Sequence, residues 1–194
     1  GWTVEGVEID PAACRHARQK HGLAVHEGTV ESGGYPENSF DAIVMNHVIE
    51  HVFDPAALLK ECHRIIKPGG HVVVITPNAG SWGHREFRES LRDLVPPRHI
   101  HIFSPKTMKK CAGLAGFEKV TAATTPANAG TIFKGSMDIQ KDGTHDMIRA
   151  NKSNRGLMQK IIRNSRKLQY QLREYDLWKL NPGLGEEVVM ICQK

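Results

Sequence analysis

The chain has 194 residues, of which 40% are apolar, and this is enough for one globular domain with a buried core over residues 1–194. Its formal net charge of +5 is mild and lies mostly late in the chain, so no nucleic-acid partner is expected. No apolar run approaches the roughly 18 residues that a membrane span needs, which excludes a transmembrane segment.

The cysteines are widely scattered, and none forms a CxxC pair. This spacing argues against a disulfide framework and against a zinc site. Reduced thiols that pack in a core are typical of a cytoplasmic protein, which is the location we expect. The positions are Cys14, Cys62, Cys111 and Cys192.

The first elements predicted are a strand over residues 4–9, a helix over residues 12–21 and a strand over residues 23–28. Pro11 suits the first turn of the helix, and Gly22 ends it. The polar, glycine-containing residues 32–39 are predicted to be a loop.

Residues 40–78 predict one βαβ crossover. A strand over residues 42–45 stops at Asn46, a helix follows, and the Pro-Gly-Gly of residues 68–70 is expected to end it before a strand over residues 72–76. Such a crossover requires a parallel sheet, whose ligands bind at the carboxyl ends of the strands. Asn46, His47 and Asn78 are therefore placed at a candidate site. The apolar positions of the helix are Leu58, Leu59, Cys62, Ile65 and Ile66.

After residue 78, predicted helices and strands continue to alternate along the chain. After a polar, histidine-rich connection over residues 79–104, Ser104 is predicted to cap a helix over residues 106–115, and strands are predicted over residues 117–124 and 185–193. Residues 126–180 form an insertion before the last strand. Within it we predict loop over residues 126–154, a short helix over residues 145–150 and a long helix over residues 157–177. Alternating strands and helices indicate a doubly wound α/β sheet.

Two segments carry a family resemblance. Residues 39–52, SFDAIVMNHVIEHV, and residues 58–78, LLKECHRIIKPGGHVVVITPN, resemble the core of class I S-adenosylmethionine (SAM) dependent methyltransferases. The branch with the ubiquinone-biosynthesis O-methyltransferases is the most similar, and the match is clearest over residues 4–120. The resemblance implies a Rossmann-like, mostly parallel sheet, SAM as cofactor, and methyl transfer to a small-molecule acceptor. The preferred acceptor is an oxygen of a sugar, quinone precursor or lipid-linked intermediate.

The family also has a first strand that ends in a glycine-rich turn, and nothing of that kind precedes the strand at residues 4–9. We therefore expect the chain to lack that unit and to expose strand edges that favour association, for example as a homodimer. Because backbone N–H groups of such a turn approach the ligand, this chain alone is expected to bind SAM poorly.

The resemblance assigns cofactor contacts to the ends of the first strands. Glu8, followed by Ile9, matches the acidic position that binds the ribose hydroxyls, and a carboxylate can accept both hydrogens. Asp10 is a competitor for that role or a helix cap. Thr29 and Val30 match the positions that meet the adenine edge, where the family usually has Asp in place of Thr29.

Asn46 matches a residue whose backbone carbonyl contacts the methionine end of SAM. His47 stands where the ubiquinone-pathway enzymes tend to have a Glu that, with the residues matching Glu50 and His51, is associated with a divalent metal. Imidazole in place of an oxygen ligand disfavours magnesium, so no metal is assigned. Candidate general bases for a hydroxyl acceptor are His51 and His101, with His99 as a neighbour.

Three alternatives remain open. The letters HVIEH match the inverted zinc-peptidase signature, with His47 and His51 as ligands and Glu50 as base. The chain can also be a non-catalytic Rossmann-like module that pairs with another chain, or a nicotinamide-cofactor protein in which Glu8 has the same role.

The long helix predicted within residues 156–177 carries several basic residues. A basic face can contact anionic lipid, phosphate-bearing substrates or nucleic acid, although a solvated face is the simpler interpretation. Peripheral membrane contact through this helix is the one membrane interaction that the sequence suggests. The residues are Lys160, Arg163, Arg166, Lys167 and Arg173.

Overall fold

The computed structural model describes the backbone of residues 1–142 and 157–194, and the side chains of residues 1–141 and 164–194. The strands form two sheets. A two-stranded parallel sheet pairs β1 (Glu5–Glu8) with β2 (Ala24–Glu27). A four-stranded sheet has the order β3-β4-β6-β5, with β3 at Phe40–Asn46, β4 at Ile66–Pro77, β6 at Glu187–Gln193 and β5 at Lys119–Thr125.

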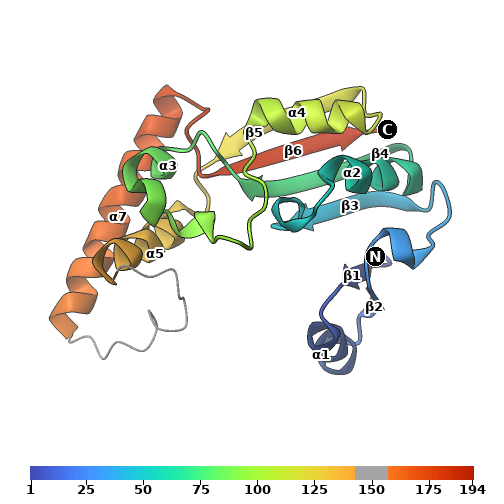
Figure 1. Ribbon diagram of the computed structural model, residues 1–194, viewed down its shortest axis with the longest axis horizontal. Helices are drawn as coiled ribbons and strands as arrows, with labels where there is room; N and C mark the ends of the chain where they lie inside the picture. Colours follow the sequence, from blue (N-terminus) through green and yellow to red (C-terminus); the bar gives the residue numbers. More distant parts are fainter. Residues whose placement is uncertain (143–156) are drawn as a thin grey trace.

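Three strands of the larger sheet run in one direction. β4 is parallel to β3, and β6 is antiparallel to both β4 and β5. The carboxyl ends of β3, β4 and β5 therefore lie at one edge of the sheet, together with the start of β6. In Figure 1 this edge faces α3, α5 and α7. All the strands predicted from the sequence are present, and the predicted Rossmann-like α/β class is confirmed.

The main core lies between this sheet and two helices, α2 (Pro55–Ile65) and α4 (Pro105–Leu114). Leu59 of α2 and Met108 of α4 are fully buried against Val72, Val74 and Met190 of the sheet. A further helix, α1 (Pro11–His21), connects β1 to β2, and its N-cap is Asp10. The apolar spacing of α2 thus faces the core, as its sequence predicts.

The predicted stop at residues 68–70 is wrong. α2 ends at Ile65, and the Pro-Gly-Gly lies inside β4. Pairing passes from Phe40–Ile66 directly to Ala42–His71, so the extra residues form a bulge. A Cβ on Gly70 would lie 2.9 Å from the carbonyl oxygen of Asp41, which explains why glycine occupies this close approach.

A second, aromatic core joins three helices beyond the carboxyl edge: α3 (Trp82–Phe87), α5 (Ala129–Asp142) and α7 (Leu157–Leu180). The prediction of loop over residues 126–154 is wrong for α5. The segment is rich in polar residues and glycine, but it also has apolar residues at helical spacing. One of them, Phe133, is fully buried against Trp82 and Phe87. The short helix predicted at residues 145–150 lies outside the described residues. Among those described, no helix is long and apolar enough to cross a membrane.

Within the described residues, the structure also has short 3-10 turns. They occur at Glu31–Gly33, Ile49–His51, Arg88–Ser90 and Arg92–Leu94. The turn at Ile49–His51 belongs to the candidate site.

The N-terminal cap of α4 is expected to contribute to the stability of the fold. The Ser104 hydroxyl accepts a hydrogen bond from the Thr107 N–H, and the Thr107 hydroxyl accepts one from the Ser104 N–H, which completes a capping box. Ser104→Ala is expected to lower the free energy of unfolding by about 1 kcal/mol because the Thr107 N–H loses its partner. Urea unfolding measures this, and Ser104→Asp, which restores a cap, should retain most of the stability. Equal losses in both variants would contradict the assignment.

Candidate functional site

A histidine marks the carboxyl edge of the sheet. His47 follows β3, and its N–H donates to the Ile75 carbonyl at 2.9 Å, which continues the pairing with β4. Its φ of +53° turns the chain sharply after Asn46. Nδ1 of the ring lies 3.1 Å from Oε1 of Glu50, and Nε2 lies 2.9 Å from Oε1 of Glu187 at the start of β6. The ring therefore joins two carboxylates from segments far apart in the sequence.

Both carboxylates have further partners. The Thr76 hydroxyl donates to Oε2 of Glu50 at 2.9 Å, and the Asn128 amide donates to Oε1 of Glu187 at 2.8 Å. Glu50 is fully buried and Glu187 nearly so. We call this set of His47, Glu50, Glu187, Thr76 and Asn128 the His47 clamp.

The clamp holds its histidine charged. Hydrogen bonds to Glu187 and then Glu50 raise the pKa of His47 to about 10, so that both ring nitrogens carry a proton at neutral pH. Burial acts to raise the pKa of Glu50 and of Glu187, but their hydrogen bonds, chiefly from His47, outweigh burial and lower both. The result is a fixed imidazolium between two carboxylates at the edge where ligands of such sheets bind.

The structure places His51, one of the two predicted bases, next to His99 and not next to the other predicted base, His101. The rings of His51 and His99 meet at 4.7 Å between centroids. Nδ1 of His51 is bonded to the Arg98 carbonyl at 2.9 Å, and Nδ1 of His99 to the Asp93 carbonyl. A carbonyl only accepts, so each Nδ1 carries a hydrogen and each Nε2 of the neutral ring has a lone pair.

His101 is turned elsewhere. Its N–H and that of Ile100 both donate to the Glu50 carbonyl, which ties this segment to the turn at Ile49–His51. The His101 ring lies with Nε2 3.4 Å from the Phe53 carbonyl, near the surface. The rings of His51 and His101 thus bond to different carbonyls, those of Arg98 and Phe53.

Glu50, His51 and His99 can hold a metal ion, because one ligand atom from each lies within 4.8 Å of the others. Two imidazole nitrogens and a carboxylate suit a transition metal better than magnesium. His47 is outside this group because both of its nitrogens bond to carboxylates. The zinc-peptidase interpretation, which needs His47 and His51 on one helix, is therefore wrong: His47 has positive φ, and the 3-10 turn begins only at Ile49.

Four of the five predicted cofactor residues, all except Asn46, lie at or just after the ends of β1 and β2. The Gly28 N–H donates to the Glu8 carbonyl at 2.9 Å, which brings Glu8 and Ile9 beside the turn at Thr29 and Val30. Oε1 of Glu8 accepts a hydrogen bond from the Asp10 N–H at 2.8 Å. The carboxylate of Asp10 is used differently, since it accepts from the Ala12 N–H as the cap of α1.

Asn46 lies in the other sheet, at the exposed end of β3. The link between the two sheets is the chain after β2: Val30 packs against the main core, which contains Met45, the neighbour of Asn46. Arg64 of α2 donates to the Tyr35 carbonyl at 2.6 Å and holds the following loop. The shared nucleoside site of Glu8 and Asn46 stays a prediction.

A family model described as a methyltransferase domain matches residues 1–122, well over half of the chain. The chain belongs to this methyltransferase family.

Individual relatives agree with the family. A probable SAM-dependent methyltransferase of Mycolicibacterium smegmatis is 36% identical over 116 residues, covering 59% of this chain and 43% of that protein. The ubiquinone biosynthesis O-methyltransferase of Alkalilimnicola ehrlichii is 39% identical over 85 residues, 40% of this chain and 34% of the relative. The chain thus spans less than half the length of these curated relatives.

Solved structures share the fold. A SAM-dependent methyltransferase of Thermotoga maritima superposes with a TM-score of 0.61 at 23% identity, covering 98% of this chain and 72% of the other. One from Archaeoglobus fulgidus gives 0.59 at 17% identity, covering 98% and 75%. At these identities the likeness establishes the methyltransferase fold alone.

Sequence reasoning missed Glu187, Asn128 and Thr76 of the clamp in this methyltransferase domain. Thr76 ends a predicted strand, so its place at the carboxyl edge was within reach. One feature of the sequence points to Glu187: two acidic residues, Glu186 and Glu187, directly precede an apolar strand. Acidic residues at such a position are buried only with partners, and this singles them out for attention.

Glu186 belongs to a second buried group. Its Oε1 accepts a hydrogen bond from the Gly83 N–H at 2.6 Å, and its own N–H donates to Oε1 of Glu174 on α7 at 3.1 Å. Burial, reinforced by neighbouring carboxylates, raises the pKa of Glu174 to about 8 and that of Glu186 to about 7. Beside Glu186 a cavity of about 10 Å³, which is room for one water, is also lined by Ser81, His84 and Asp93.

Proposed function

We propose that the protein containing this chain is a SAM-dependent methyltransferase that methylates an oxygen of a small-molecule acceptor. The observation that carries the proposal is a family match combined with the position of Glu8, whose carboxylate stands at the carboxyl end of β1 beside the Thr29–Val30 turn. This is where nucleoside ligands of α/β sheets bind.

The residues take distinct roles in this proposal. Glu8 accepts hydrogen bonds from the ribose hydroxyls, Ile9 lies beside it, and the Thr29–Val30 turn meets the adenine edge. The Asn46 carbonyl, at the tip of β3, contacts the methionine end. Bound SAM supplies a methyl group on a positively charged sulfur, and the protein's main task is to align the acceptor with it.

A hydroxyl acceptor must lose its proton as its oxygen bonds to the methyl carbon. Nε2 of His51 carries a lone pair because Nδ1–H donates to the Arg98 carbonyl, so His51 can take that proton. His101 is the other candidate, and its position near the surface suits exchange of the proton with water. Sugars, quinone precursors and lipid-linked intermediates all offer such a hydroxyl.

Calorimetric titration with SAM and transfer of a labelled methyl group test the proposal. The titration should use the longest protein encoded in frame with this chain, because the relatives extend beyond it. We expect SAM to bind with micromolar affinity and to raise the melting temperature. Stabilisation by NAD but not by SAM would overturn the proposal in favour of a nicotinamide cofactor.

A binding module is the second candidate. Among the strands that the structure describes, β3 is the last of its sheet, and Val44 on it is 67% exposed. Such a strand can pair with another chain, including a second copy of this one. Association without SAM binding or methyl transfer, measured by sedimentation, would favour this function.

A further inference from the structure

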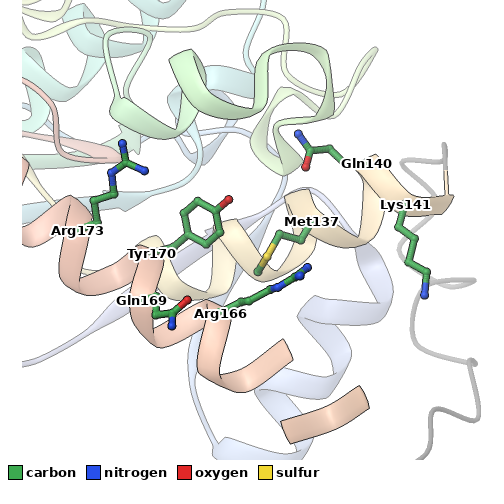
Figure 2. A pocket seen from close by; sticks show the side chains of 7 residues that line it. All are labelled: Met137, Gln140, Lys141, Arg166, Gln169, Tyr170 and Arg173. Atoms are coloured by element: carbon green, nitrogen blue, oxygen red, sulfur yellow. The ribbon is translucent and has the colours of Figure 1, made fainter. Parts of the chain in front are cut away.

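Two helices of the aromatic core, α5 and α7, face each other across a pocket. The pocket has a volume of about 720 Å³ and lies between α5 and α7. Figure 2 shows its lining side chains projecting from these two helices. Residues three, four and seven apart share one helix face, and the spacing on each helix fits this rule. The lining residues are Met137, Gln140 and Lys141 of α5, and Arg166, Gln169, Tyr170 and Arg173 of α7.

Among the residues that the structure describes, every charged side chain of this lining is positive. Lys141 comes from one helix, and Arg166 and Arg173 come from the other, while the remaining lining residues are neutral. Glu174, next to Arg173 along α7, points away from the pocket: it is fully buried and accepts the N–H of Glu186. Burial raises the pKa of Glu174 to about 8, so it is largely neutral at pH 7 and offsets little of this charge.

The back of the pocket is held by the aromatic core. The Arg173 guanidinium lies 5.2 Å from the centre of the Trp82 ring, a cation–π contact that limits its motion. The Tyr170 ring packs 5.7 Å from Trp82 and 5.9 Å from Phe133. Trp82 begins α3, which follows β4, and its N–H donates to the Leu184 carbonyl just before β6. The pocket is thereby anchored to the carboxyl edge of the sheet.

We propose that this pocket binds the phosphate or diphosphate group of the methyl acceptor. The inference rests on the proposed methyltransferase function and narrows its substrate to a phosphate-bearing small molecule. Guanidinium forks match phosphate oxygens, and both helices contribute positive charge to the lining of this pocket, through Lys141 on α5 and through Arg166 and Arg173 on α7. The volume lies in the range of small-molecule sites, and Met137 and Tyr170 offer apolar surface for the rest of the ligand.

Titration with inorganic pyrophosphate tests the pocket without requiring methyl transfer. We expect saturable binding to the chain, and Arg166→Gln should weaken it about tenfold because one charged hydrogen-bonding partner is lost. Lys179→Gln is the matched control: it removes a positive charge from the same helix, where the ammonium lies 4.4 Å from the Tyr175 ring and outside the pocket. Melting temperatures of both variants check that the helices remain folded.

The outcomes separate this inference from the proposed function. No pyrophosphate binding, or equal weakening by Arg166→Gln and Lys179→Gln, overturns the inference even where SAM binds. Binding to vesicles of anionic phospholipid without binding of pyrophosphate also overturns it, in favour of membrane contact. Site-specific pyrophosphate binding by a protein that fails to bind SAM leaves the anion site standing and removes its proposed link to methyl transfer.

Discussion

Replacement of His47 by asparagine is expected to lower the free energy of unfolding by about 3 kcal/mol, because two buried carboxylates lose the cation between them. The side chains of Glu50 and Glu187 are 0% and 3% exposed, so water cannot replace the imidazolium well. The 34% exposure of the His47 side chain keeps the expected loss at the lower end for a buried ion pair. Asparagine tolerates the positive φ at this position, so the loss reports the missing charge rather than backbone strain.

The effect should depend on pH in a definite direction. Because the folded-state pKa of His47 is raised from 6.5 to about 10, its contribution is complete below pH 6.5 and is lost as the pH rises through about 10. The lowered pKa values of Glu50 and Glu187 give a contribution present above about 4.5 and lost on acidification below it. The stability gap between wild type and His47→Asn is therefore largest near pH 5–6.5.

Urea unfolding at several pH values measures this gap, and a second substitution controls for its cause. Glu187→Gln alone should destabilise the wild type, because it removes a charged partner of His47. In the His47→Asn background the same change should recover about 1 kcal/mol, because it removes one of two uncompensated buried charges. Additive losses in the double variant, or a gap independent of pH, would show that the clamp is not an electrostatic unit.

The His47 clamp depends on long-range contacts, which the sequence does not predict, whereas the strands and caps follow from local signals. β-branched runs and helix caps are local signals, and they correctly located every predicted strand and the caps at Asp10 and Ser104. The bond between His47 and Glu187 joins residues 140 positions apart and depends on the register of β6 against β4. No local pattern encodes that register, so the sequence predicts His47 at the carboxyl edge of the sheet but does not predict its bond to Glu187.

The two misread elements have a similar cause. Pro-Gly-Gly ordinarily ends a helix, and only the close approach of the Asp41 carbonyl to Gly70 makes it a bulge inside β4. The residues of α5 have a loop-like composition, and their helix is stabilised by burial of Phe133 among aromatic rings from α3 and α7. In both places tertiary contact overrides the local preference. The anion pocket depends on the same unpredicted helix.

Replacement of Glu8 by alanine is expected to weaken SAM binding about a hundredfold, because two charge-assisted hydrogen bonds to the ribose are lost together. Glu8→Gln should give a smaller loss, since one amide oxygen can still accept from one hydroxyl or from the Asp10 N–H. Calorimetry with the SAM-binding form of the protein measures both variants.

Glu27→Ala is the matched control for Glu8. Glu27 lies directly opposite Glu8 in the pairing of β1 with β2, and its carboxylate, 3.8 Å from Arg18, has no assigned contact with the cofactor. It removes the same charge from the same edge of the same small sheet, so nonspecific loss of charge or of local stability should affect both variants alike. A selective loss at Glu8 requires a direct contact with the ligand. Equal affinities in the two variants would place the nucleoside elsewhere and remove the basis for pairing Glu8 with Asn46 in one cofactor site.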